Sequence, residues 1–243
     1  MERKEFLLQL QHFILRPVIM SHTEMAAEFE KARVVGLDMC QVFPTSIIPP
    51  NCEFVQHNLV EGRLPFEDNT FDFVFQRLLL GGLRPKEWRH VVRELGRVTK
   101  PGGWIELVEI DGSGGNNGPK TMKVWNWIHQ AFATQGIDVY IGRQQGLKKL
   151  LEEEACLPLV HHDTLQLDTG EHGGKIGELL KENEVAFWRA MTPLVLQRSQ
   201  VTHEHFEQAI AEAEEEIEEY KSYHIFYCAY GQKPEKTLEE MDI

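Results

Sequence analysis

Hydrophobic and polar positions follow their clearest pattern between residues 64 and 109, where they predict a strand, a helix and a second strand. Phe71–Gln76 (FDFVFQ) is a short aromatic and β-branched run, the composition of a buried strand. From Trp88 to Val98, apolar residues recur at steps of three and four, which predicts one apolar face along a helix. Pro101-Gly102-Gly103 should end that helix, because proline cannot continue it and glycine permits a tight reversal. Trp104–Val108 (WIELV) is then the second strand of a β-α-β unit.

The chain before this unit contains two further predicted strands, Val34–Asp38 (VVGLD) and Cys52–Asn58 (CEFVQHN). Residues 5–16 have the pattern of a short amphipathic helix that ends at Pro17. Between them, residues 18–20 could form a short strand, and residues 21–24 have the spacing of a capping box for a helix through Phe29.

The chain after the unit is predicted to be mainly helical. The glycine-rich stretch Asp111–Pro119 should be its most flexible part. The expected helices are 121–134, 146–155, 176–191 and 203–222, and the expected strands are 159–167 and 223–230. In the last helix, Phe206, Ile210 and Ile217 lie on one apolar stripe that must be buried against something.

Composition narrows the possible partners and location. A chain of 243 residues with a net charge of −13 does not offer the concentrated basic surface that nucleic acid requires. No apolar run approaches the length of a membrane span, so no membrane partner is expected. The four cysteines are scattered without a CxxC pair and indicate reduced thiols. The expected location is the cytoplasm, with the nucleus as an alternative.

The phrases LPFEDNTFDFVFQ and RVTKPGGWIELVE resemble the class I S-adenosylmethionine (SAM) dependent methyltransferases, and the resemblance extends from the first residues to about Gln232. It implies a Rossmann-like α/β fold with a mostly parallel sheet, whose last strand is antiparallel and lies beside its predecessor. YHIFYCAYG fits that strand. Residues 1–232 are then one domain, with a helical cap at about 176–222 over a small-molecule substrate, and residues 233–243 are a flexible tail.

The resemblance also implies a SAM site at the carboxyl ends of the strands, where open α/β sheets bind ligands. Asp38, followed by Met39, ends one strand, and its carboxylate can accept hydrogen bonds from both ribose hydroxyls. Asn58 matches the family position that contacts adenine, usually an Asp, and the backbone N–H of Leu59 would serve a ring nitrogen. The alternatives are that Asp38 caps a loop and that Asn58 is a turn residue.

Gln76 and Arg77 end the Phe71 strand, where the resembled enzymes pass closest to the sulfonium. Methyl transfer is a direct displacement that needs a base only if the nucleophile must lose a proton. His57, Glu109 and Tyr140 are possible bases, but none stands out, so no catalytic residue is assigned. The histidine pairs 161–162 and 203/205 lack the helical i, i+4 spacing that grips a metal, and no metal is expected.

The sequence departs from the family ahead of VVGLD. The resembled enzymes carry a first, central strand and a glycine-rich turn there, whereas no glycine precedes Gly36 in this sequence. The chain therefore looks as though a segment has been removed. Two hypotheses follow: a methyltransferase with an unusual SAM pocket, or a methyltransferase-like pseudoenzyme that acts by binding. A third, a nicotinamide-dependent oxidoreductase, also requires the glycine fingerprint, and the KPGGW phrase favours a methyltransferase.

Overall fold

The computed structural model describes residues 22–40, 43–44 and 48–235. The chain divides into two compact units, Met1–Thr70 and Phe71–Ile243, and each unit is described by itself. The predicted helix at 5–16 and the short strand at 18–20 lie outside the described residues. The prediction of one domain over residues 1–232 stays a prediction.

The described residues of the first unit form a two-stranded parallel sheet with one helix. Helix α2 (His22–Glu28) precedes β1 (Val34–Asp38), which pairs with β2 (Cys52–Gln56). The side-chain amide of Asn51 lies within 3.1 Å of three carbonyl oxygens, those of Ala26, Phe29 and Ala32, and so ties the end of α2 to the start of β2. Strand β1 has the predicted bounds, and β2 ends at Gln56, two residues earlier than predicted. The turn that follows begins at Asn58, whose carbonyl oxygen accepts the Glu61 N–H.

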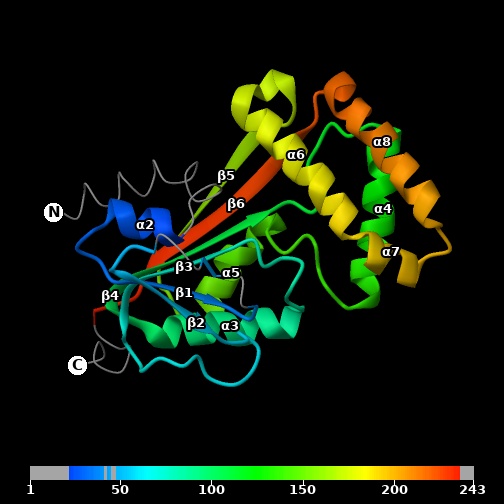
Figure 1. Cartoon of the computed structure of the whole chain (residues 1–243). Coiled ribbons are helices and arrows are strands. Elements are labelled where there is room, and N and C mark those ends of the chain that lie inside the picture. The colour runs from blue at the N-terminus through cyan, green and yellow to red at the C-terminus, as the bar shows by residue number, and fades with distance from the viewer. Residues whose placement is uncertain (1–21, 41–42, 45–47, 236–243) are drawn as a thin grey trace. The chain divides into compact units, whose positions relative to one another are not determined.

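The second unit contains a four-stranded sheet in the order β3-β4-β6-β5 (Figure 1). Strands β3 (Phe71–Arg77) and β4 (Thr99–Ile110) are parallel. The last strand, β6 (Tyr223–Gln232), lies antiparallel between β4 and β5 (Val160–Asp168). This arrangement is the Rossmann-like pattern that the sequence predicted, including the antiparallel final strand.

Helices α3 (Pro85–Val98) and α5 (Gly146–Glu153) pack against this sheet and against each other. The predicted apolar face of α3 is buried from Trp88 to Val98. The prediction that Pro101-Gly102-Gly103 ends the helix was wrong. Helix α3 already ends at Val98, and the three residues lie inside β4. There the pairing passes from Phe71↔Thr99 to Phe73↔Trp104, so the glycines form a bulge in the strand rather than the end of the helix.

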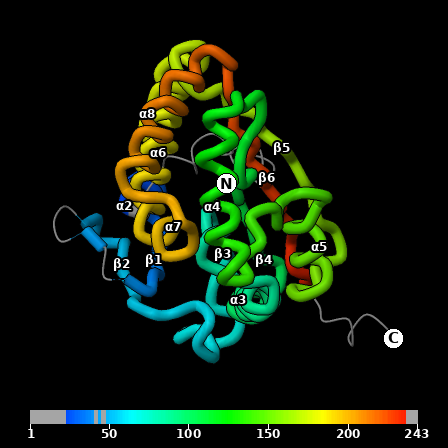
Figure 2. The backbone as a smooth tube through the Cα atoms, turned by 90° about the vertical axis from the view of Figure 1, so that its right-hand side faces the viewer, coloured from blue at the N-terminus to red at the C-terminus, as the bar shows by residue number. Residues whose placement is uncertain are grey.

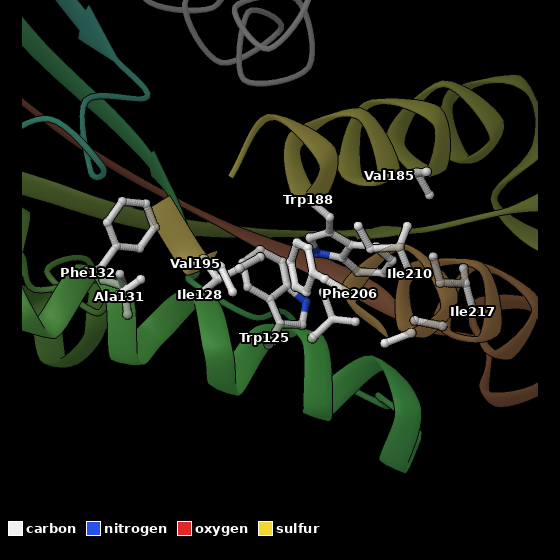
Figure 3. Packing of buried hydrophobic residues seen from close by; sticks show 14 of the residues in the cluster. Trp125, Ile128, Ala131, Phe132, Val185, Trp188, Val195, Phe206, Ile210 and Ile217 are labelled. Carbon is white, nitrogen blue, oxygen red and sulfur yellow. The ribbon is translucent and has the colours of Figure 1, made fainter. Parts of the chain in front are cut away.

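Four helices form a second layer of this unit: α4 (Pro119–Thr134), α6 (Gly174–Ala190), α7 (Thr192–Arg198) and α8 (His203–Tyr220). Figure 2 shows them grouped beside the sheet. Their apolar faces meet in one core, where Trp125 and Trp188 pack edge to face at 6.1 Å (Figure 3). The stripe predicted on α8 is fully buried there at Phe206, Ile210 and Ile217. Short 3-10 helices at Arg143–Gln145 and Glu171–Gly173 complete the unit.

One expectation of flexibility was wrong. The stretch Asp111–Pro119 is packed: Asp111 and Ser113 are buried, and Gly115 pairs with Tyr223 at the start of β6. Of the expected tail at 233–243, the structure describes residues 233–235, and there the Lys233 ammonium donates to the carbonyl oxygens of Gly96 and Thr99, both at 2.8 Å. The flexibility of the tail stays a prediction. Interactions across the sheet, which no local pattern shows, hold both Asp111–Pro119 and Lys233.

Candidate functional site

The first unit brings together the residues predicted to hold the nucleoside. Asp38 ends β1, and its backbone carbonyl accepts the N–H of His57 at 3.0 Å, which places Asn58 at the same edge of the sheet. The Asp38 side chain is exposed, and its Oδ1 accepts the Cys40 N–H at 2.7 Å. Within the described residues Oδ2 accepts no hydrogen bond. This free oxygen suits a ribose hydroxyl, and Met39 beside it is 60% exposed.

Asn58 is already engaged in the turn after β2. Its Oδ1 accepts the Val60 N–H at 3.3 Å, and its amide donates to Glu61 at 2.8 Å. Asn58 and Leu59 are both half-buried. An adenine contact by Asn58 would therefore compete with a turn-forming role, and that contact remains a prediction.

The second unit positions Gln76 and Arg77 at the carboxyl end of β3, opposite Leu107 and Val108 of β4. Gln76 is 7% exposed, and neither atom of its amide has a hydrogen-bond partner among the described residues. A buried amide without partners costs about 1–3 kcal/mol, so this group suits a polar ligand that would satisfy it.

Glu109 follows on β4 and is completely buried. Its carboxyl oxygens accept the backbone N–H groups of Leu79 at 2.8 Å and Leu80 at 3.1 Å. Burial raises the pKa of Glu109 to about 8, although those two hydrogen bonds lower it. Leu78, at φ +54°, is a strained non-glycine residue in the same loop. Glu109 therefore holds the loop after β3. Its carboxyl group is buried and both oxygens are engaged, so it is not placed to take a proton from a substrate.

Sequence reasoning missed a polar cluster just beyond β4. It consists of Asp111, His129, Tyr140, Arg143 and Tyr227, and we call it the Asp111 cluster. The Arg143 guanidinium donates to both carboxylate oxygens of Asp111, at 2.7 and 2.9 Å. The members come from the residue after β4, from α4, from the 138–145 loop and from β6, so only the folded topology could reveal the group. Among the described residues, no three His, Cys, Asp or Glu side chains are grouped to hold a metal.

Comparison with known proteins agrees with this geometry. Residues 20–107 match the methyltransferase domain family. The chain is 24% identical over 225 residues to the N-methyltransferase sirN of Leptosphaeria maculans, which covers 87% of this chain and 76% of the relative. It is also 36% identical over 90 residues to the secondary metabolism regulator laeA of Coprinopsis cinerea, although that match covers 36% of this chain and only 21% of the regulator.

The solved structures agree in fold. A Galdieria sulphuraria protein named for sarcosine and dimethylglycine methylation superimposes with a TM-score of 0.51 at 14% identity, over 88% of this chain and 75% of the other. The fold is that of a class I, Rossmann-like methyltransferase domain. Residues 20–107 match a methyltransferase domain of the class I SAM-dependent family, whose cofactor is SAM.

Proposed function

We propose that this protein transfers a methyl group from SAM to a nitrogen of a small molecule. The similarity to the N-methyltransferase sirN carries this proposal, because it extends over 87% of the chain and is not confined to the cofactor-binding part. The similarity to the regulator laeA says less about the function of this chain, since the match spans about a fifth of the length of laeA. Within the described residues, no helix is long and apolar enough to span a bilayer.

SAM supplies a methyl group that its sulfonium already activates, so the protein contributes mainly positioning. We assign the ribose hydroxyls to Asp38, whose Oδ2 is free within the described structure. We assign a polar group near the reacting centre to Gln76, whose buried amide a ligand would satisfy. Arg77 is assigned to an anionic group of cofactor or substrate, because a cation beside the sulfonium is unfavourable.

We propose that α6, α7 and α8 cover the acceptor side of the site. They lie in sequence between β5 and β6, and their apolar faces are occupied by the core that they share with α4. The acceptor would then be chosen by the helical layer, and the cofactor by the strand ends.

The test is transfer of an isotope-labelled methyl group from SAM to a small-molecule extract, with products identified by mass spectrometry. Wild type should label at least one nitrogen-containing small molecule. Asp38→Ala should lose most of this labelling, while Glu53→Ala, an exposed acid on β2 paired with Arg33, should keep it. Labelling that is equal in Asp38→Ala and wild type would contradict the assignment of Asp38.

The alternative is a pseudoenzyme that binds without turnover. The absence of any glycine before Gly36 and the similarity to a named regulator both favour it. Saturable SAM binding without any labelled small molecule would support this alternative over the enzyme.

A further inference from the structure

The Asp111 cluster fastens the 138–145 loop to the end of the sheet. Besides its two bonds from Arg143, the Asp111 carboxylate accepts the Tyr227 hydroxyl at 3.1 Å and the Ser113 N–H at 3.2 Å. Burial alone would raise the pKa of Asp111, but these hydrogen bonds and the Arg143 charge lower it. Asp111 is thus ionised and fully engaged, and its part is to hold the loop.

The loop is pressed closely onto the sheet. A Cβ at Gly112 would lie 2.5 Å from the Val139 carbonyl oxygen, and one at Gly142 would lie 2.3 Å from the Tyr227 ring. Two consecutive residues, Gln144 and Gln145, adopt left-handed conformations with φ of 53° and 60°. Such conformations cost about 1–3 kcal/mol each and cluster at functional sites. The fold therefore maintains one strained conformation of this loop.

Tyr140 and His129 form a hydrogen-bonded pair within the cluster. His129 Nε2 lies 2.9 Å from the Gly112 carbonyl oxygen, which can only accept, so Nε2 carries the proton. Nδ1 is then the acceptor in the neutral ring, and the Tyr140 hydroxyl at 3.2 Å donates to it. Burial lowers the pKa of His129 and keeps this acceptor unprotonated near neutral pH.

Tyr140 is half-buried, and Arg143 lies 3.9 Å above its ring centre. The guanidinium would stabilise negative charge that develops on the Tyr140 oxygen. In register, Arg77 of β3 faces Val108 of β4, and Asp111 follows three residues later, roughly 10 Å further along. The pair thus lies beyond the carboxyl end of the parallel strands, on the side of this unit where ligands bind.

We propose that Tyr140, backed by His129, accepts the proton that the methyl acceptor loses, so that this site takes nucleophiles with a removable N–H or O–H proton. The proposal rests on the methyl transfer proposed above. Tyr140 would be the catalytic residue, since its oxygen touches the acceptor. His129, Arg143 and Asp111 would be positioning residues that act through it.

The step balances without any further reactant. The acceptor N–H or O–H bond breaks as its proton moves to the Tyr140 oxygen, and the Tyr140 hydroxyl proton moves to His129 Nδ1. His129 becomes an imidazolium whose Nε2–H still donates to Gly112. The freed electron pair on the acceptor forms the new bond to the methyl carbon, while the carbon–sulfur bond breaks and its electrons remain on sulfur.

The test uses 4-nitrophenol as an acceptor mimic, because its phenolate is visible in the absorption spectrum. The probe is titrated with the full chain at one pH unit below its own pKa. On binding to wild type, the phenolate-to-phenol ratio should rise about ten-fold or more, equivalent to at least one unit of pKa. Tyr140→Phe and His129→Gln should each abolish the rise, and the matched variants Tyr230→Phe and His161→Gln, on β6 and β5, should retain it.

Absence of saturable probe binding, binding without a rise, or an unchanged rise in Tyr140→Phe would overturn the proposal. His129→Gln decides the matter if Tyr140→Phe does not fold. The proposed function fails separately: a chain that ionises the probe but labels no small molecule from SAM would overturn the methyl transfer and keep the proton-accepting pair.

Discussion

Glu109 and Asp111 are two residues apart, on either side of the last residue of β4, yet the pKa values of their carboxyl groups are shifted in opposite directions. Glu109 is buried with only backbone N–H donors, and its pKa rises to about 8. Asp111 is buried with a guanidinium and a phenol as additional donors, and its pKa falls despite the burial. The contrast shows that partners, more than burial, decide the charge of an acid at this edge.

The raised pKa of Glu109 makes stability depend on pH. The folded state keeps this proton up to about pH 8, while the unfolded chain releases it near the ordinary value of 4.5. The folded state therefore binds more protons in this window, and the free energy of unfolding should fall as pH rises from about 4.5 to 8. Glu106, whose pKa burial raises to about 7, acts in the same direction.

Glu109→Gln should remove part of this pH dependence, because an amide resembles the protonated acid and does not titrate. Urea unfolding at pH 5 and pH 8 measures the effect. The loss of stability between the two pH values should be smaller in the variant than in wild type. The exposed control Glu153→Gln should behave as wild type, and an equal loss in Glu109→Gln would show that Glu109 is ionised throughout.

At the scale of elements, the helical layer depends on the buried stripe of α8. Ile210 is fully buried among residues of α4, α6 and α8. Ile210→Ala should lower the free energy of unfolding by about 2–5 kcal/mol, because it removes buried apolar surface and leaves a cavity. Glu215→Ala on the exposed face should stay within about 0.5 kcal/mol. Chemical denaturation of both variants checks this, and a change under 1 kcal/mol in Ile210→Ala would show a loosely packed layer.

Periodicity was sufficient to predict the elements whose own residues carry the signal. The apolar steps of α3 and α8, and the aromatic run of β6, gave both the type and the approximate bounds. The bulge at Gly102 could not be predicted, because it depends on register with Phe71 and Phe73. The ordered positions of Asp111 and Lys233 likewise depend on Arg143 and on the end of α3, which lie far away in sequence.

The same reasoning applies to the candidate site. The places of Asp38 and Gln76 near strand ends were predictable, because each residue ends an apolar run. Their contacts with a ligand stay predictions, based on where open α/β sheets bind ligands. Tyr140 appeared in the sequence only as one of three possible bases. Its hydrogen bond to His129 joins residues on a helix and a loop, and periodicity contains no information about such a pairing.

For the whole molecule, we infer from the sequence that the segment ahead of β1 limits how tightly SAM can bind. Family members place a glycine turn there, so that the backbone approaches the cofactor and a helix N-terminus faces its carboxylate. In this sequence the first glycine is Gly36, inside β1.

We therefore predict weak SAM binding by this chain. Losing two charge-assisted hydrogen bonds of roughly 1.5–3 kcal/mol each removes about 3–6 kcal/mol. A cofactor otherwise held at ~10 μM would then bind with a Kd of roughly millimolar or weaker. A Kd for SAM in the micromolar range would contradict this prediction. It would favour a methyltransferase with an ordinary affinity for SAM.

The central claim is that the chain binds SAM through the strand-end carboxylate of Asp38, and calorimetric titration of SAM and of its demethylated product into the full chain tests it most directly. We predict saturable binding of both, with a Kd near or above millimolar, that weakens further in Asp38→Ala and is unchanged in Glu53→Ala. Absence of saturable binding, or the same affinity in Asp38→Ala as in wild type, would contradict it.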